Sequence, residues 1–408
     1  MSKYDIGFNE ALNLALETVT PMGVETVSTS LIVGRVCAED VTALIDYPES
    51  DVSLKDGFAV VAVDISCAST SNPVRLELAG TVGAGDRSVL TVETATTVRV
   101  LSGATIPSGA DAVLAEEFAS VGPDSITVVA CAEPGRNILF RGSEIRKGEV
   151  LAGPGQVFTP SLVGLVVAGG LTAVPVFRRP RVGLLATGNE ILLPGRPPEP
   201  GKLFASNLAL QQAWLQSLGM ETEIHGAGDS REDLSRAVLS ILERCDVLLT
   251  SGGAWKGERD LIVKVLDDLG WKKIFHRVRI GPGKAVGMGI LGDKPVFCLP
   301  GGPPSNEVAF LLMALPALFR MAGHARGPHQ RFYGILDREI SGQEDWTQVI
   351  PCSAERQGSS IHLIPLERVR RLSSMAKTHG FVLIPEGTTA IAAGTPVMFI
   401  CSKSDALY

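Results

Sequence analysis

The chain has 408 residues, of which 45% are hydrophobic and 20% charged, with a formal net charge of −7 and a pI near 5.5. This length exceeds the roughly 250 to 300 residues that one hydrophobic core can serve, so we expect several ordered globular domains. The acidic balance excludes a broad nucleic-acid-binding surface, because such surfaces are basic.

The sequence carries no signal for export or membrane insertion. Its seven cysteines form no CxxC pair and no Cys/His cluster at zinc spacing, which favours a reducing compartment. Residues 1–19 mix acidic and apolar side chains and predict an amphipathic helix, in contrast to a secretory leader. The longest apolar run, Leu162 to Phe177, is shorter than the roughly 18 to 20 residues of a membrane helix and contains Gly169, Gly170 and Pro175. We therefore expect a soluble, cytoplasmic protein.

The first part of the chain predicts a small β domain. Residues 74–129 are rich in Val, Thr and Gly, contain short alternating stretches such as TVRVLSG and SITVVA, and show no helical stripe of apolar residues. After His324 the pattern is again that of strands, with FYGIL, SSIHLIP, GFVLIPEG and TPVMFI separated by turn residues. This second stretch predicts a separate C-terminal β domain.

Between these regions, after Pro180, strands alternate with helices. The strands are RVGLLATGNE, DVLLT and KPVFCL. The helices are expected to begin at the N-caps Ser206 and Ser230, with two more ending near Gly270 and before Gly323. This order predicts an α/β fold with a doubly wound, mostly parallel sheet, whose ligands bind at the carboxyl ends of the strands.

The glycine-rich segment TSGGAWKGERD, Thr250 to Asp260, follows one of these strands and precedes a helix. Its glycines let backbone N–H groups approach a ligand, and the helix N-terminus favours an anion such as a phosphate. A pyranopterin is a second candidate ligand for such a loop. The alternative is a plain turn in which Asp260 only complements the helix dipole.

Two further loops follow strand ends. LPGGPPSNE, Leu299 to Glu307, is stiffened by prolines that would preorganise a pocket, or else merely starts a helix with Ser305 as its cap. RIGPGKAVGMG places Lys284 after a tight turn, but the spacing of a nucleoside triphosphate loop is absent, because Ala285 follows the lysine. A solvated lysine is the alternative there.

Acidic residues recur at the same kind of junction, at Glu190, Asp229 and Asp260. In a parallel sheet the three would converge on one edge, where carboxylates suit Mg²⁺. Asp229 lies beside the expected cap Ser230 and is the one that fits a purely structural role best. Near the N-terminus, Asp56 precedes Gly57, which is also an ordinary turn dipeptide.

Taken in order, these segments resemble one family. The blocks that carry the resemblance are Ser53–Val60 (family pattern S-A-M-D-G-Y-A-V), Arg99–Val113 (R-I-x-T-G-A-x-x-P-x-G-A-D-A-V), Gly135–Ile145 (G-x-N-I-R-x-x-G-E-D-I), Ala186–Ile191 (S-T-G-D-E-L), Ala205–Asn207 (D-S-N), Thr250–Asp260 (S-S-G-G-x-S-x-G-x-x-D) and Leu299–Ser305 (L-P-G-N-P-V-S). The chain is similar to the molybdopterin molybdenumtransferases, the family of bacterial MoeA and the E domain of gephyrin. The similarity spans almost the whole sequence and is weakest after Gly327.

The resemblance implies a multidomain fold and an activity. It implies an elongated N-terminal and linker domain (1–45 and 140–178), an inserted β domain (46–139), an α/β molybdopterin-binding domain (179–325) and a C-terminal β domain (326–408). It also implies a homodimer, with a cleft between the α/β domain of one subunit and the inserted domain of the other. Members insert molybdate into adenylylated molybdopterin with release of AMP, require a divalent cation such as Mg²⁺, and work beside other proteins of molybdenum-cofactor biosynthesis.

The resemblance also implies roles for individual residues. The catalytic acids would be Asp56, Glu190, Asp229 and Asp260, of which the last three would hold the metal. The substrate would contact a hydroxyl in place of the family's threonine, a further acid, the glycine-rich loop, two basic residues and two prolines: Ser102, Glu144, Thr250, Gly252, Gly253, Arg277, Lys284, Pro300 and Pro303.

Four positions depart from the family pattern. Lys55 replaces a methionine, Asn189 an aspartate, Gly281 a lysine and Gly302 an asparagine. Loss of the lysine at 281 removes one pocket cation, and Lys55 is a candidate to restore that charge from elsewhere. The alternatives to the transferase are a divergent paralogue that handles tungstate and an inactive pterin-binding scaffold. Retention of all five acidic positions favours catalysis. A related pterin- or nucleotide-binding hydrolase would lack the N-terminal blocks.

Overall fold

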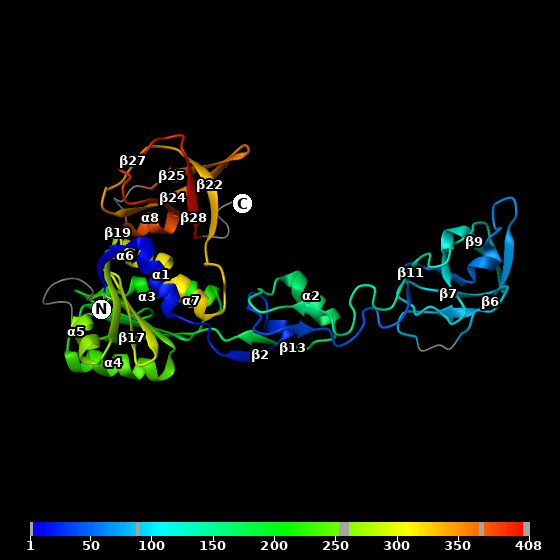
Figure 1. Ribbon diagram of the computed structural model, residues 1–408, viewed down its shortest axis with the longest axis horizontal. Helices are drawn as coiled ribbons and strands as arrows, with labels where there is room; N and C mark the ends of the chain where they lie inside the picture. The colour runs from blue at the N-terminus through cyan, green and yellow to red at the C-terminus, as the bar shows by residue number, and fades with distance from the viewer. Residues whose placement is uncertain (1–2, 87–89, 253–260, 367–370, 403–408) are drawn as a thin grey trace. The chain divides into compact units, whose positions relative to one another are not determined.

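The computed structural model describes residues 3–86, 90–252, 261–366 and 371–402 (Figure 1). Contacts divide the chain into two units. The larger comprises Met1–Glu25, Gly34–Val36 and Phe177–Tyr408, and the smaller comprises Thr26–Val33 and Cys37–Val176. None of the helices in the described ranges is long and apolar enough to cross a membrane.

Four parallel strands form the centre of the larger unit. They lie in the order β17-β14-β18-β21 and comprise Thr222–Ala227, Val182–Thr187, Val247–Ser251 and Lys294–Leu299. Along β14, Leu184 packs in one apolar core and Leu185 in another. The sheet is therefore covered on both faces, as the doubly wound prediction requires.

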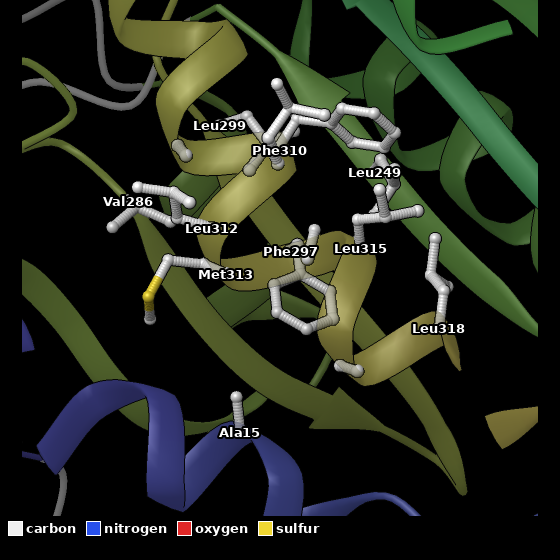
Figure 2. Close-up of a cluster of buried hydrophobic side chains, with 14 of the residues drawn as sticks. Ala15, Leu249, Val286, Phe297, Leu299, Phe310, Leu312, Met313, Leu315 and Leu318 are labelled. Carbon is white, nitrogen blue, oxygen red and sulfur yellow. The ribbon is translucent and has the colours of Figure 1, made fainter. Parts of the chain in front are cut away.

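Helices supply the two covering layers. The first core contains α1 (Phe8–Thr18), α3 (Ser206–Ser217), α6 (Pro303–Ala309) and α7 (Leu315–Met321), and the second contains α4 (Arg231–Arg244) and α5 (Leu261–Asp268). A π-helical turn, Phe310–Ala314, joins α6 to α7. Figure 2 shows side chains of this segment meeting Phe297 and Leu299 of β21, with Ala15 of α1 opposite.

Of the two predicted N-caps, Ser230 is confirmed and Ser206 is wrong. The Ser230 hydroxyl accepts a hydrogen bond from the Asp233 backbone N–H at 3.1 Å and caps α4 as expected. Ser206 is instead the first residue of α3, because the Ala205 N–H is bound to the Leu192 carbonyl and Ala205 stands at the cap. The alternative for LPGGPPSNE is met in part: a proline, Pro303, starts α6, whereas Gly302 and not Ser305 is the cap.

Antiparallel strands extend the sheet. They are β19 (Lys272–Gly281) and β20 (Gly287–Leu291), and the N-terminal strand β1 (Lys3–Gly7) pairs parallel to β19. Beyond β19 follow the C-terminal strands β24 (Thr347–Gln357), β25 (Ser360–Pro365), β22 (Gln330–Leu336), β28 (Pro396–Cys401) and β26 (Gly380–Ile384). Ile280 and Gly281 pair with Thr347 and Gln348, so these strands continue the central sheet. A short helix, α8 (Arg371–Lys377), and the strand pair β23 (Ile340–Ser341) with β27 (Ala390–Ile391) complete this region.

The smaller unit contains a six-stranded sheet with the order β8-β5-β7-β6-β10-β9. Its strands are Ala112–Ala115, Gly57–Val60, Thr96–Val100, Val74–Val82, Ser125–Val128 and Ala119–Val121. Within the described part of 74–129, the only helical turn is the 3-10 turn Glu116–Phe118, which agrees with the β prediction.

The rest of the smaller unit is built from short strand pairs and one helix. The pairs are β2 (Val24–Ser28) with β13 (Ala173–Phe177), β3 (Val41–Thr42) with β12 (Val150–Ala152), and β4 (Val52–Ser53) with β11 (Ile138–Leu139). The helix is α2 (Pro160–Ala168), capped by the Thr159 hydroxyl.

Candidate functional site

Three neighbouring strands of the central sheet end together. Because β14, β18 and β21 are parallel, the loops after Thr187, Ser251 and Leu299 lie at one edge. The Gly252 N–H donates to the Leu299 carbonyl at 3.3 Å. A Cβ at Gly252, whose φ is +104°, would lie 3.0 Å from the Thr187 hydroxyl, so this crossing requires glycine.

Two asparagine side chains tie these loops to the helices. The Asn207 amide, from α3, donates to the Ser251 hydroxyl at 3.0 Å and to the Gly301 carbonyl at 2.9 Å. The Asn306 amide, from α6, donates to the Ser251 hydroxyl at 3.2 Å and to the Pro300 carbonyl at 2.7 Å. The edge is therefore preorganised by polar groups, of which Asn306 is almost fully buried.

The predicted loop residues occupy different depths at this edge. Pro300 is buried and Pro303 is partly exposed as the first residue of α6. Thr250 is fully buried opposite Cys298, so its side chain supports β18 from inside, and a contact between Thr250 and substrate stays a prediction. Burial raises the pKa of the Cys298 thiol to about 12, which keeps it inert. Gly253 lies outside the described residues.

Glu190 and Asp229 are exposed on two adjacent loops of the same edge. The Asn189 N–H donates to the Asp229 carboxylate at 3.2 Å, and the Asp229 N–H donates back to the Asn189 side-chain oxygen at 3.3 Å. A Cβ at Gly188 would lie 2.7 Å from Glu190 Oε2, so the Glu190 carboxylate folds back over the loop. The residue that departs from the family pattern, Asn189, thus holds the two loops together.

These loops border an open pocket of about 420 Å³ that includes Gly188, Asn189, Arg196, Glu199 and Gly228. Within the described ranges, no three His, Cys, Asp or Glu residues are grouped closely enough to hold a metal ion. Asp260, the third acid of the predicted metal set, lies outside those ranges. The described part of that set is the pair Glu190 and Asp229.

The two predicted basic residues have separate surroundings. The Lys284 ammonium lies 4.1 Å from the centre of the Trp346 ring, a cation–π contact with the C-terminal strands. Arg277, in β19 at φ +66°, places Nε 3.6 Å from Asp5 Oδ1 and its guanidinium 5.5 Å from the Tyr4 ring centre. These contacts of Arg277 are with the N-terminal strand, which the sequence did not predict.

A second pocket, of about 270 Å³, lies between the start of α6 and the C-terminal strands. Its lining includes Ser305, Glu307, Arg371, Ser374 and Thr378. A guanidinium and several hydroxyls are hydrogen-bond donors for an oxyanion, whereas the Glu307 carboxylate opposes one. The residues of α8 could not be predicted from the sequence, because this short helix has no buried apolar stripe.

In the smaller unit the structure brings Asp56 and Ser102 together. The Ser102 N–H donates to Asp56 Oδ1 at 2.7 Å, and the Ser102 hydroxyl donates to the Leu54 carbonyl at 3.3 Å. Gly57 makes this corner feasible, since a Cβ there would lie 2.1 Å from the Leu114 carbonyl oxygen. Both functional side chains are exposed.

Glu144 is exposed as well, and its backbone N–H donates to the Tyr47 carbonyl. Beside it, Asp46 accepts hydrogen bonds from the Lys147 backbone N–H and from Arg141, which lower the pKa of the Asp46 carboxyl. Glu144 therefore lies beside a fixed turn of the chain. Among the residues that the structure describes, none forms a hydrogen bond or ion pair with its carboxylate.

The other three positions that depart from the family pattern differ in how much space surrounds them, and so in whether the family's residue would fit. Lys55 Nζ lies 3.9 Å from Glu117, and both side chains are exposed. A Cβ at Gly281 would lie 3.0 Å from the Gln348 amide nitrogen, so Gln348 occupies the space of the missing lysine. A Cβ at Gly302 would have no atom within 4 Å.

Comparison with known proteins gives consistent matches. Residues 6–170 match the model of the MoeA N-terminal region (domain I and II), and residues 183–320 match that of a probable molybdopterin binding domain. The chain is 30% identical to molybdopterin molybdenumtransferase 2 of Mycobacterium tuberculosis, over 89% of this chain and 91% of that protein. It is also 30% identical to the molybdopterin molybdenumtransferase of Bacillus subtilis, over 91% and 88%. The crystal structure of a molybdopterin biosynthesis MoeA protein from Pyrococcus horikosii superposes with a TM-score of 0.84 at 31% identity, covering 98% of this chain and all of that one.

Proposed function

The chain belongs to the molybdopterin molybdenumtransferase family, and from this premise we propose that it inserts molybdate into adenylylated molybdopterin with release of AMP. Two molybdate oxygens would leave as water with the dithiol protons, and the two dithiolene sulfurs of the pterin would replace them on molybdenum. A water molecule would attack the phosphoanhydride and release AMP, leaving the phosphate on the pterin. The protein would supply binding, charge and orientation of that water.

The carboxyl edge of β14, β18 and β21 is the observation that carries this proposal. It combines a glycine crossing at Gly252, two exposed carboxylates at Glu190 and Asp229, and loops fixed by Asn207 and Asn306. Open parallel sheets bind ligands at this edge. A rigid polar cradle beside carboxylates suits a large anionic pterin nucleotide that arrives with a cation.

We assign Mg²⁺ to the acidic side of this edge. Two exposed carboxylates on adjacent loops repel each other, and a hard divalent cation shared with the ligand's phosphate would relieve that repulsion. The cation would polarise the phosphate during AMP release. The Asn189 bridge supports the assignment, since it keeps Asp229 beside the Glu190 loop with no added negative charge.

The pocket between α6 and α8 is a second part of the proposal, as the place for molybdate. Arg371 supplies positive charge and the hydroxyls of Ser305 and Ser374 supply donors for a tetrahedral oxyanion. Tungstate has the same charge and shape, so these donors serve either oxyanion. The proposal for molybdate rests on the relatives, whose names specify molybdenum.

We further propose that the protein is a cytoplasmic homodimer. The smaller unit exposes apolar side chains on elements that pack together, namely Leu165 and Val167 on α2, Val150 on β12 and Leu31 on the 3-10 turn Thr29–Leu31. A second copy would cover them. All seven cysteines are free, in keeping with a reducing compartment where other proteins of cofactor assembly would be partners.

The decisive experiment is anaerobic incubation of the full chain with adenylylated molybdopterin and Mg²⁺, with molybdate or tungstate added in parallel. AMP release and metal incorporation are followed together. Molybdate-dependent release of AMP supports the transferase. Turnover with tungstate alone identifies the divergent paralogue, and tight pterin binding with no turnover for either oxyanion identifies a scaffold.

A further inference from the structure

Ser251, at the carboxyl end of β18, receives two hydrogen bonds on its hydroxyl oxygen. One comes from the Asn207 amide at 3.0 Å and the other from the Asn306 amide at 3.2 Å. These amides approach from different helices, α3 and α6. The serine is therefore held between two long-range contacts, with 8% of its surface still exposed.

The orientation of both amides is decided by their other partners. The same Asn207 nitrogen also donates to the Gly301 carbonyl, and the same Asn306 nitrogen donates to the Pro300 carbonyl. A carbonyl oxygen only accepts, so the atom facing it must be the nitrogen. The Asn306 oxygen in turn accepts from Gln211 at 2.7 Å, which agrees with this assignment.

A hydroxyl has two acceptor sites and one proton. Both acceptor sites of Ser251 are occupied by N–H donors, so its proton must point in the remaining direction. Across the residues that the structure describes, no group accepts this proton from the Ser251 hydroxyl. Ser251 is the last residue of β18, so this hydroxyl lies at the carboxyl edge of the sheet, where the proposed ligand binds.

We infer that Ser251 is a dedicated hydrogen-bond donor to the bound ligand and that Asn207 and Asn306 are positioning residues that aim its proton. The inference rests on the proposed function for the identity of the ligand. The acceptor is a ligand oxygen or ring nitrogen, which the pterin ring and the nucleotide phosphate both offer. If one acceptor site were free, the Ser251 O–H bond could rotate among several directions. With both sites occupied, the hydroxyl can only act as a donor to the ligand.

Binding of adenylylated molybdopterin to the full chain tests the donor. Ser251→Ala should weaken affinity about tenfold, the scale of one lost hydrogen bond to a charged or preorganised partner. Ser251→Thr keeps the hydroxyl and should bind within about twofold of the wild type. Ser251→Ala should also lower the melting temperature, because the buried Asn306 amide loses one of its two acceptors, so affinities are compared well below both melting transitions. Equal binding by Ser251→Ala and the wild type would overturn the inference.

A double-mutant cycle tests the positioning role. Asn207→Ala frees one acceptor site of Ser251, so the proton gains other directions and affinity should fall about threefold. The same substitution made in Ser251→Ala should have no further effect on affinity. A purely structural role would instead give the same loss in both backgrounds. Gln212→Ala, on the same helix but bonded to Thr222, is the matched control and should leave affinity unchanged.

AMP alone separates the two sources of the acceptor. If Ser251→Ala weakens AMP binding by the same factor, the acceptor is on the nucleotide, and if AMP binding is unchanged, it is on the pterin. A neutron structure of the free protein makes the test independent of the ligand. The Ser251 deuteron should point away from both amides toward solvent, and a deuteron directed at a protein carbonyl would overturn the inference even if the transferase activity is real. Failure of the wild type to bind adenylylated molybdopterin would overturn the proposed function instead.

Discussion

The carboxyl edge of the central sheet and the Asp56 corner of the smaller unit both hold exposed acidic side chains in place, but with different contacts. At the edge, the loops are tied by amides from α3 and α6, whose partners lie far away in sequence. At the corner, one glycine and one backbone hydrogen bond hold an exposed carboxylate. The edge therefore depends on the packing of helices in the larger unit, whereas the corner depends on the absence of a side chain at Gly57.

The largest effect is expected at the corner, from Gly57→Ala. The new Cβ would lie 2.1 Å from the Leu114 carbonyl oxygen, so β5 and β8 must separate. We expect a loss of about 3 kcal/mol or more in the stability of the smaller unit, measured by chemical denaturation. Gly153→Ala is the control, because its nearest neighbour, Asp40, would lie 3.5 Å away at ordinary contact distance. Equal stability of the two variants would mean that the corner does not depend on glycine.

At the edge, Glu190→Gln should leave folding intact, since the side chain is exposed, and should impair chemistry. In the proposed Mg²⁺ site, loss of this carboxylate should lower AMP release about a hundredfold. The Mg²⁺ concentration for half-maximal rate should rise as well. A variant with the wild-type Mg²⁺ titration would remove Glu190 from the metal site.

A smaller effect is expected for Lys284→Ala. The Lys284 ammonium is already held over the Trp346 ring, so its position for an anionic ligand is preorganised. Binding of adenylylated molybdopterin should weaken about tenfold at fixed salt. Lys264→Ala, an exposed lysine of α5, changes the net charge equally and should not alter affinity. Matching losses in the two variants would point to long-range attraction alone.

The smallest effect is expected for Gly302→Asn, which restores the residue of the family pattern. A side chain at 302 meets no atom within 4 Å, and the backbone φ of −71° is open to any residue. Stability should change by less than about 0.5 kcal/mol. A melting temperature many degrees lower would show that the loop before α6 is more crowded than the structure has it.

Much of the central fold could be predicted because its signals are local. The strand KPVFCL is observed as Lys294–Leu299, and Ser230 caps α4 through its neighbour Asp233. The N-terminal strand β1 was missed because the pattern of residues 1–19 predicts one amphipathic helix, of whose described part only Phe8–Thr18 is helical. Its pairing partner, β19, is remote in sequence.

The candidate site was predicted in outline only. Gly252 and the acids at strand ends follow from the parallel topology, which sequence periodicity reveals. Asn207 and Asn306 could not be found in this way, because an amide has no periodic signature and their shared partner, Ser251, is brought to them only by the packing of α3 and α6. For Thr250 the pattern locates the end of the strand without saying that this side chain is buried.

As the family resemblance implies, we propose that the corner and the edge serve one reaction, with each site of a homodimer taking the corner from one chain and the edge from the other. Co-expression of Asp56→Asn with Glu190→Gln, each inactive alone, tests it most directly. Random pairing gives mixed dimers in which one of two sites has both acids intact, so AMP release should return to about one quarter of the wild-type rate. No recovery, from dimers shown to contain both variants, would contradict the claim.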